Sequence, residues 1–351
     1  MRERWGASGI SGRIDGGGAS DGATVIGGME HRLRADSTKC IDPIDGVMQD
    51  GSRTLVMNPI SGSGDHAEDV RIRAREMGFD VRETEGEDDA VRLAREAAEE
   101  GVSELAVCGG DGTINEALRG LEDADYLEEV TLSVIPAGTA NLLAGNIGVH
   151  DVAHGLELAG SGPVRSVDVG MAEGEPFIVS CIAGLPAEAS TAATSDLKER
   201  FGTLAFLVTA LQEAASFEPL SLEIETRNGS GTEAWAGEAI AVLVGNARKF
   251  VEEGGQADME DGLFDVAVVE RMPAGNLVTE AITHRILGEG TEHVQHFPAS
   301  EVEVACDGPI RFSRDGELFE REEIELYALP RTLDLRVGED YDPDPNGVRE
   351  E

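Results

Sequence analysis

Lysine is almost absent from this chain of 351 residues: only Lys39, Lys198 and Lys249 occur, and arginine supplies the other cations. Asp and Glu number 69 against 28 Lys and Arg, so the formal net charge is −41. Because no basic stripe exists, no nucleic-acid partner is expected. Apolar strand-like segments distinguish the chain from a disordered acidic protein. We therefore expect a folded, acidic surface suited to molar salt, where the Debye length is about 3 Å, and a halophilic source, an archaeon. A surface for cations or a basic partner is the alternative.

Cysteine pairs and long apolar runs are also missing. Cysteine occurs only at scattered positions, Cys40, Cys108, Cys181 and Cys306. Without a C-x-x-C or Cys/His cluster, neither a disulfide framework nor a zinc site is predicted. No apolar run reaches the roughly 18 residues of a membrane span, and the N-terminus lacks an apolar signal core. We expect a cytoplasmic protein whose contact with a membrane is peripheral.

The most informative segment is Gly-Gly-Asp-Gly-Thr at residues 109–113, which follows an apolar strand and precedes a helix predicted over 114–121. Glycines let backbone N–H groups approach a ligand closely, and the helix directs its positive end at the same place. This arrangement suits a phosphate or nucleotide, and the Asp111 carboxylate could hold Mg²⁺ against phosphate oxygens. The alternative is a tight turn in which Asp111 and Thr113 cap the helix.

Two further segments have the same strand, polar loop and helix pattern. Strand 54–57 runs into Asn-Pro-Ile-Ser-Gly at 58–62, and strand 132–135 runs into Pro-Ala-Gly-Thr-Ala-Asn at 136–141. In order, the predicted elements are strand 54–58, helix 65–77, strand 79–82, helix 88–100, strand 104–108, helix 114–121, strand 131–135 and helix 140–146. This alternation predicts a parallel, doubly wound sheet, and the three loops should converge at the carboxyl ends of its strands.

The second half of the chain has a different pattern. Strands are predicted over 164–170, 177–182, 220–226, 238–244, 263–269, 301–305 and 310–313. Turn residues such as Asn-Gly at 228–229 join many of them, which predicts a largely antiparallel domain. A helical region over 187–217 interrupts the strands, and its apolar residues would form either a core face or the lining of a lipid cleft. A last strand is predicted over 333–337.

The ordered motifs at 58–62, 109–113 and 136–141 resemble the diacylglycerol kinase catalytic family over roughly residues 53–337. That superfamily also includes sphingosine and ceramide kinases, soluble bacterial lipid kinases and, more distantly, NAD kinases. The resemblance implies an α/β + β fold: an N-terminal doubly wound parallel three-layer domain, followed by a mostly antiparallel β-sandwich domain whose C-terminal strand returns to the first domain.

The expected domains are a nucleotide-binding α/β domain (53–163 and about 324–338) and a β-rich lipid or substrate domain (164–323). Residues 339–351 are expected to be a disordered acidic tail. Residues 1–52 are either disordered or the product of an upstream start codon, with Met29 or Met48 as the true start.

The resemblance also assigns a nucleotide site, with Asp111 acting through Mg²⁺. The implied contacts are Asn58, Thr84, Gly109, Gly110, Asp111, Gly112, Thr113, Ile114, Asn115 and Thr139. Two of these rest on less: Thr84 follows the second strand in a variable context, and Asn58 could instead only cap a turn. Family members also usually carry a basic residue after the first motif, where this chain has Ser63, Gly64 and Asp65. That contact is either missing or replaced by Arg71 or Arg73.

A metal site is implied at Ala257–Val266, which resembles the Asp-Gly-Leu segment of the family. Carried over, Asp261 is the side-chain ligand of Mg²⁺, and Asp258 and Leu263 contribute backbone oxygens, or Asp258 its carboxylate. Ligation by oxygen alone suits Mg²⁺ or Ca²⁺. The alternative is an acidic β-turn of the kind common in an acidic chain.

A catalytic base is implied by Arg-Asp-Gly-Glu at 314–317, which resembles the family's Asp-Gly-Glu motif. Glu317 would be the general base toward a lipid hydroxyl, and the alternative is that Asp315 and Gly316 only form a hairpin turn.

The resulting prediction is an ATP- and Mg²⁺-dependent kinase of a diacylglycerol-like lipid, or of an ether lipid in an archaeon, at the membrane surface. Two alternatives are an NAD kinase, although no Asn-Glu-Pro-Tyr-like segment occurs, and a non-catalytic nucleotide or lipid sensor. A homodimer through the β-rich domain stays open.

Overall fold

A computed structural model of the chain describes residues 52–184, 218–250, 255–271 and 294–345. By its contacts the chain divides into two units, 1–48 and 49–351, and every described residue belongs to the second. All but Ser52 of the predicted extension 1–52, and the whole predicted helical region 187–217, lie outside the described residues.

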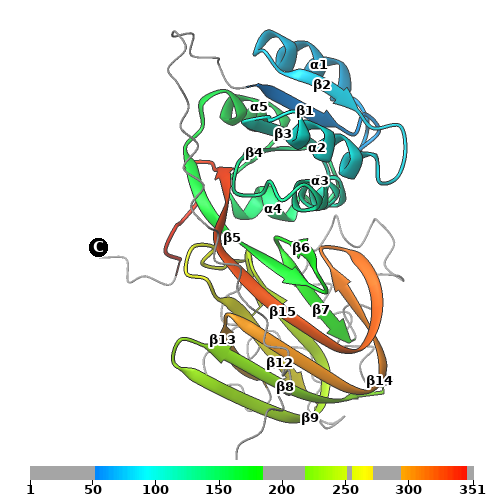
Figure 1. Cartoon of the computed structure of the whole chain (residues 1–351), viewed down its shortest axis with the longest axis vertical. Coiled ribbons are helices and arrows are strands. Elements are labelled where there is room, and N and C mark those ends of the chain that lie inside the picture. The colour runs from blue at the N-terminus through cyan, green and yellow to red at the C-terminus, as the bar shows by residue number, and fades with distance from the viewer. Residues whose placement is uncertain (1–51, 185–217, 251–254, 272–293, 346–351) are drawn as a thin grey trace, which may run out of the picture. The chain divides into compact units, whose positions relative to one another are not determined.

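The first region alternates strands and helices around a parallel sheet. Its elements are β1 (Arg53–Met57), α1 (Ala67–Glu76), β2 (Asp80–Glu83), α2 (Asp89–Glu99), β3 (Glu104–Gly109), α3 (Asp111–Asp123), β4 (Thr131–Pro136), α4 (Leu142–Asn146) and α5 (Val152–Ser161). The strands are ordered β4-β3-β1-β2 (Figure 1), and all three of their pairings are parallel.

Helix α3 begins at Asp111, earlier than the predicted start at Ile114. Gly110 is extended, with φ −89° and ψ −179°, so the chain turns into the helix directly after it. Asp111 therefore lies in the first turn, where the helix dipole favours a carboxylate. The sequence also gave no indication of α5.

Helices cover both faces of this sheet, because successive side chains of a strand point to opposite sides. Leu55 and Met57 of β1 belong to an apolar cluster with residues of α1 and α5. Val56, between them, belongs to a second cluster with residues of α2, α3 and α4. Because helices cover both faces, the polar loops emerge at the edge formed by the carboxyl ends of the strands.

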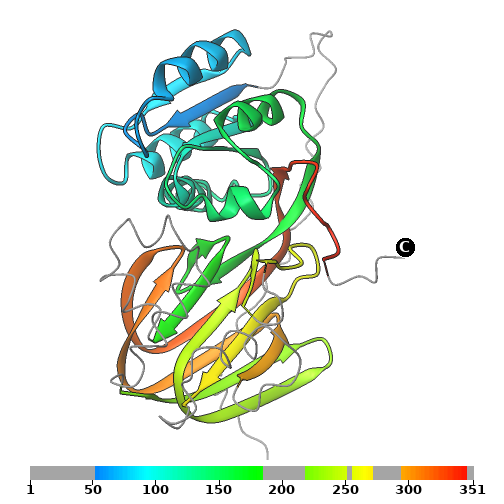
Figure 2. The same cartoon turned by 180° about the vertical axis from the view of Figure 1, so that it is seen from behind.

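The second region is formed almost entirely by antiparallel strands. They are β5 (Val164–Ala172), β6 (Glu175–Phe177), β7 (Ser180–Gly184), β8 (Leu220–Asn228), β9 (Gly231–Gly245), β10 (Arg248–Lys249), β11 (Gly255–Gln256), β12 (Phe264–Glu270), β13 (Val294–Ala299), β14 (Glu301–Arg314) and β15 (Glu317–Arg336). Both β7 and β8 pair with β9 and with β14, so these four strands form a closed circuit around an apolar core. Figure 2 shows β12, in yellow, beside β9.

Several strands differ from their predicted bounds. The predicted strand 177–182 is divided between β6 and β7, and the predicted strands 301–305 and 310–313 are one strand, β14. An irregularity between Ala305 and Ile310 shifts the register of β14 against β15, and it separates the two apolar patterns in the sequence. Such bulges bend a strand without ending it.

Strand β15 connects the two regions. It begins beside β14 and ends in parallel pairing with β4, where Asp334 faces Thr131 and Leu335 faces Leu132. The predicted strand 333–337 is therefore the end of a 20-residue strand that returns to the parallel sheet. One sheet of 13 strands results, because β15 joins the antiparallel strands to β4.

The expectation of a disordered tail from residue 339 is wrong for residues 339–345. The N–H of Gly338 donates to the Ile147 carbonyl at 2.8 Å, and Tyr341 is buried, with its hydroxyl donating to Glu260 at 3.2 Å. Gln256 and Asp342 also exchange two hydrogen bonds. The prediction relied on the acidic composition of the segment and overlooked Tyr341, whose buried side chain attaches the segment to the fold.

None of the described helices is both long and apolar enough to cross a membrane. Cys108 and Cys181 are buried, and Cys306 is half-buried.

Candidate functional site

The three glycine-containing loops meet at the carboxyl ends of β1, β3 and β4. A Cβ atom on Gly138 would lie 2.4 Å from the Cα atom of Gly110, and one on Gly62 would lie 2.6 Å from the Ala137 carbonyl oxygen. Both distances are shorter than real Cβ contacts, so only glycine permits this approach. The prediction that the loops converge is therefore confirmed for residues 58–62, 109–113 and 136–141.

Side chains fix the third of these loops. Asn141 is left-handed, with φ 48°, and its amide both accepts from the Gly138 N–H and donates to the Gly138 carbonyl, each at 2.9 Å. The Asp111 carboxylate accepts the N–H of Leu143 at 3.1 Å. Asp111 thus joins the start of α3 to the start of α4, and its other oxygen has no hydrogen bond among the described contacts.

The predicted nucleotide contacts differ in exposure. Gly112 and Thr139 are exposed, and Asn58, Thr84, Gly110 and Asp111 are half-buried. Gly109, Thr113, Ile114 and Asn115 are buried. The Ile114 N–H already donates to the Gly110 carbonyl at 3.2 Å, and Asn58 Nδ2 reaches Thr113 Oγ1 at 3.5 Å. Among the predicted contacts, the side chains that reach the surface of the loops are therefore those of Asp111, Thr139, Asn58 and Thr84.

No lysine or arginine occurs in the loop residues 58–65, 84–88, 109–113 or 136–141. The two arginines considered as replacements are engaged elsewhere. Arg71 pairs with Glu83 at 2.7 Å and also with Glu68, and Arg73 lies 3.6 Å from Asp69. These loops therefore offer a ligand backbone N–H groups and neutral or acidic side chains, without an ammonium or guanidinium group.

The hairpin between β14 and β15 carries the predicted base. Asp315 (φ 44°) and Gly316 (φ 99°) form a two-residue turn, and Arg314 faces Glu317 across it. Positive φ at both central residues is the geometry of a tight hairpin turn. The turn interpretation is thus correct for Asp315 and Gly316, and it places Glu317 as the first residue of β15.

Asp315 also anchors this hairpin. Its carboxylate accepts the backbone N–H groups of Ile178, Val179 and Ser180 at 2.7, 3.0 and 2.8 Å. Burial raises the pKa of Asp315 to about 6; the three N–H groups oppose this shift, and the charge of Asp111 adds to it. The nucleotide loop and the hairpin are therefore close enough for their carboxylates to interact.

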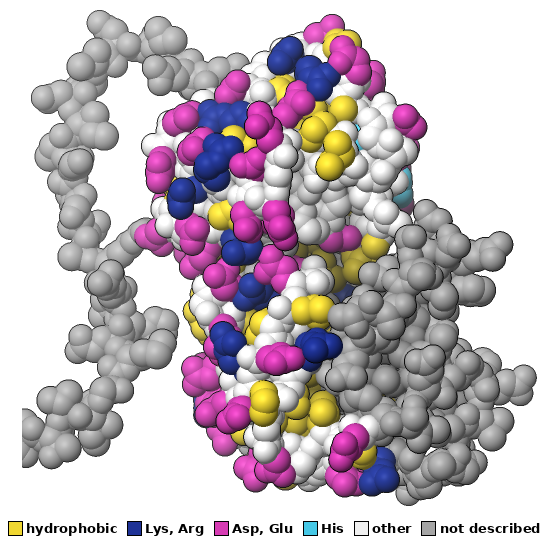
Figure 3. All heavy atoms as spheres, turned by 90° about the vertical axis from the view of Figure 1, so that its right-hand side faces the viewer, with side chains coloured by type: hydrophobic (Ala, Val, Ile, Leu, Met, Phe, Trp, Pro, Cys, Tyr) yellow, Lys and Arg dark blue, Asp and Glu magenta, His cyan; other side chains and the backbone are white. Residues whose placement is uncertain are grey.

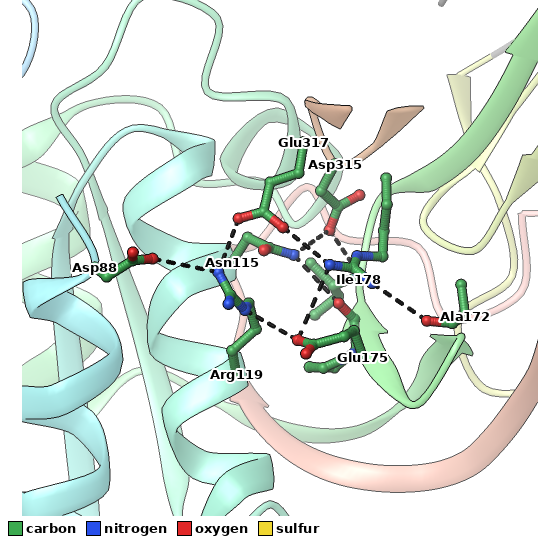
Figure 4. A network of polar contacts seen from close by, with 10 residues as sticks. Asp88, Asn115, Arg119, Ala172, Glu175, Ile178, Asp315 and Glu317 are labelled. Carbon is green, nitrogen blue, oxygen red and sulfur yellow. Dashed lines mark hydrogen bonds and ion pairs between the residues drawn. The ribbon is translucent and has the colours of Figure 1, made fainter. Parts of the chain in front are cut away.

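Helix α3 links the two halves of the site (Figure 4). Asp111, Asn115 and Arg119 lie four residues apart and therefore on one face of the helix. Asn115 Nδ2 reaches Asp315 at 3.4 Å, and Arg119 Nη1 donates to Glu317 at 2.9 Å. The helix that begins at the glycine loop thus contacts the predicted base through Arg119, two turns further along. Neither Arg119 nor Arg314, the second partner of Glu317, was a predicted site residue.

The predicted metal loop is ordered by its own carboxylates. Asp258 accepts the N–H of Glu260, and Asp261 accepts that of Leu263, each at 2.9 Å. These contacts match the acidic β-turn interpretation. The described residues contain no set of three His, Cys, Asp or Glu side chains placed to hold a metal ion. The predicted ligands combine carboxylate and backbone oxygens, and that oxygen-only set fits Mg²⁺.

Asp168, which was not a predicted site residue, holds this loop by a hydrogen bond to its backbone. It is fully buried and accepts the N–H groups of Gly262 and Arg331, both at 2.7 Å. Burial raises its pKa to about 6, and the charges of Asp261 and Asp258 add to the shift. Burial also raises the pKa of Asp261, with a contribution from Asp258. A cation at the loop would offset this accumulated negative charge.

Two family models match the chain. The diacylglycerol kinase catalytic domain matches residues 52–172, and the YegS C-terminal NAD kinase beta sandwich-like domain matches residues 179–337. Of the residues that the structure describes, only 173–178 and 338–345 lie outside these two matches.

Curated relatives extend over most of the chain. A probable lipid kinase YegS-like protein of Pseudomonas putida is 30% identical over 281 residues, covering 77% of this chain and 90% of the relative. A diacylglycerol kinase of Bacillus subtilis is 28% identical, with coverages of 75% and 88%. A crystal structure of a putative diacylglycerol kinase from Bacillus anthracis aligns with a TM-score of 0.69 at 22% identity, over 83% of this chain and 97% of that one. That last similarity shows the shared fold.

Proposed function

The chain belongs to the diacylglycerol kinase catalytic family, and we propose that it transfers the γ-phosphoryl group of ATP to a hydroxyl of a diacylglycerol-like lipid with the help of Mg²⁺. The observation that carries the proposal is the contact between α3 and the β14–β15 hairpin. It brings Glu317 to the helix whose first turn holds Asp111, with Arg119 Nη1 2.9 Å from the Glu317 carboxylate. A kinase of this kind needs a phosphate site and a base side by side.

The nucleotide phosphates would bind at the three loops. Gly110 and Gly112 leave backbone N–H groups accessible at the positive end of α3, where anions are favoured. Asn58, Thr84 and Thr139 add polar side chains at the same surface. The buried Gly109, Thr113, Ile114 and Asn115 would shape this site from beneath.

Mg²⁺ would neutralise phosphate oxygens when bound, and the oxygens of Asp111 suit that role. The second proposed Mg²⁺ site consists of Asp261 with Asp258 and Leu263. Asp168 holds the loop of this second site through the Gly262 N–H. Its buried carboxylate and those of Asp258 and Asp261 favour a cation at this place.

In the proposed step, Glu317 accepts the proton of the lipid hydroxyl as that oxygen attacks the γ-phosphorus. A bond forms between the lipid oxygen and phosphorus, and the bond from phosphorus to the β–γ bridging oxygen breaks. ADP leaves, and the product is a lipid phosphate monoester. Each Glu317 oxygen accepts one N–H bond, from Arg119 and from Arg314, so each keeps a free acceptor position for this proton.

The acidic surface argues against electrostatic docking to an anionic membrane. Acidic side chains are spread over the face drawn in Figure 3, with arginines among them. Such a surface would repel anionic headgroups unless salt screens it. We propose peripheral contact from the cytoplasm in a salt-adapted host, with an isoprenoid ether lipid as acceptor if that host is an archaeon. A homodimer through the β-rich region remains part of the proposal.

Transfer of labelled γ-phosphate into total polar lipids of a halophile, in molar KCl with Mg²⁺, tests this function. We expect a new labelled lipid with the wild type, and its loss with Glu317→Gln and with Asp111→Asn. Glu320→Gln is the matched control, because Glu320 lies on the same strand, is exposed and, among the described residues, forms an ion pair with Arg311 alone, at 3.3 Å.

No lipid product from any acceptor, while ATP still binds, would contradict the kinase proposal and favour a nucleotide sensor. Phosphate transfer to NAD instead of lipid would identify the NAD kinase alternative.

A further inference from the structure

The carboxylate of Glu317 is held between two guanidinium groups that come from different parts of the fold. Arg119 of α3 donates to Glu317 Oε1, and Arg314 of β14 donates to Glu317 Oε2, both at 2.9 Å. The two arginines thus hold both oxygens of the proposed base. One of them lies on the helix of the nucleotide loop, and the other lies on the hairpin itself.

Arg119 is itself fixed by further carboxylates (Figure 4). Its Nε donates to Glu175 at 3.0 Å, and its Nη1 lies 3.5 Å from Asp88. Because a guanidinium is planar and rigid, contacts to Glu175 and Glu317 together set its orientation. The position of Glu317 relative to α3 is therefore determined by geometry as well as by charge.

Arg314 is held from the opposite side. Its side chain is 9% exposed, its Nη1 donates to the Ala172 carbonyl at 3.2 Å, and its guanidinium lies over the Phe319 ring at 5.5 Å. Arg314 Nε is buried without a partner among the described residues. Leaving a buried donor unpaired is costly, so stabilisation alone is a poor account of this arginine.

We propose that Arg119 and Arg314 are positioning residues that orient the Glu317 carboxylate toward the acceptor hydroxyl. This inference rests on the proposed function, in which Glu317 is the base. Since Arg119 lies on α3, the base takes its place only while the hairpin contacts the helix that begins at Asp111. The phosphate site and the base are thereby aligned by one rigid element.

Substitution of Arg119 gives the first test. Arg119→Gln should lower kcat for lipid phosphorylation on the order of 100-fold, the cost expected when a reacting group is misplaced by about 1 Å, and leave the KM for ATP nearly unchanged. Arg119→Lys should have a higher kcat than Arg119→Gln, because an ammonium can contact either Glu317 or Glu175. It should stay below the wild type, because only the planar guanidinium can bind both carboxylates at once. Arg321→Gln is the control and should keep the wild-type kcat, since Arg321 lies on β15 with Glu317 but pairs with Glu173, at 2.9 Å.

Chemical rescue separates positioning from folding. In Glu317→Ala the two guanidinium groups would form a carboxylate site, so added formate should restore a measurable part of kcat. In the double variant Glu317→Ala/Arg119→Gln, formate should restore little, although both proteins melt at similar temperatures.

A wild-type kcat in Arg119→Gln, or equal rescue in both alanine variants, would overturn the positioning role. Full activity of Glu317→Ala without formate would instead contradict the proposed function, and it would do so in a variant that retains Arg119.

Discussion

The loops around Asp111 and the hairpin that carries Glu317 lie against the same helix, α3, but they are built from different chemistry. The loops contain no lysine or arginine, and they are shaped by close backbone contacts such as that between Gly110 and Gly138. The hairpin is held by charged side chains, with Arg119, Arg314 and Glu175 around Glu317.

The difference has a physical consequence. Backbone N–H groups do not titrate near neutral pH, so a site built from them keeps its hydrogen-bond donors as the pH changes. Ion pairs are screened where they are exposed and persist where they are buried or held by several contacts. In the proposed site, the two arginines are thus placed at the carboxylate that must be oriented, and the loops would bind phosphate through backbone and a cation.

The largest effect is expected from breaking the backbone contact. Gly138→Ala places a Cβ atom 2.4 Å from Gly110 Cα, so the loops must separate. We expect ATP affinity and kcat/KM to fall by roughly 100-fold, because a shift of about 1 Å misplaces the phosphates. Gly145→Ala in α4 is the control, since its Cβ would meet nothing within 4 Å. Calorimetric ATP titration measures the change, and unaltered affinity in Gly138→Ala would show that the loops do not form the nucleotide site.

A smaller effect, on the free energy of unfolding, is expected from the Asp315 carboxyl group that anchors the hairpin. Burial raises the pKa of Asp315 from 3.8 to about 6, so protonation stabilises the folded state. That contribution is complete below pH 4 and is lost as the pH rises through about 6. Relative to Asp315→Asn, which does not titrate, the wild type should lose about 2 kcal/mol of unfolding free energy between pH 4.5 and 7.5. Denaturant unfolding of both proteins in the same salt measures this, and a constant difference across pH would contradict it.

The smallest effect is expected at the outer edge of the ion-pair network. Asp88 is 70% exposed and lies 3.5 Å from Arg119, so Asp88→Asn should change the unfolding free energy by less than about 0.5 kcal/mol. Asparagine tolerates the left-handed backbone of this residue, with φ 60°, and the helix start is preserved. Thermal unfolding and kcat measure the outcome. A large loss of kcat would show that the network acts as a whole and not through the pairs at Glu317.

The loops could be predicted from sequence because their chemistry is local. Each strand, glycine loop and helix start lies within about ten residues, and the parallel order of the strands follows from their alternation with helices. Helix α5 was missed because it contains Gly155, which is normally read as a helix breaker. A Cβ on Gly155 would lie 2.7 Å from the Val134 carbonyl oxygen, so this glycine allows close packing of α5 on β4.

The hairpin side of the site could be predicted only in part. Glu317 was identified by its motif, but its partner Arg119 is 198 residues away, and no sequence pattern relates the two. The only available signal was the spacing of Asp111, Asn115 and Arg119 along one helix face. Asp168 was missed for the same reason, since its partners Gly262 and Arg331 are 94 and 163 residues away.

The path of β15 has a consequence for synthesis. The strand that completes the parallel sheet beside β4 is made about 200 residues after it, because Thr131 and Leu132 pair with Asp334 and Leu335. Until then β4 is an open edge, and open edges invite pairing with other chains. The parallel sheet therefore cannot be completed on the ribosome before residues 334–335 have emerged, and such long-range pairing is slow. A cell that makes this protein must keep the edge of β4 protected until that strand is available.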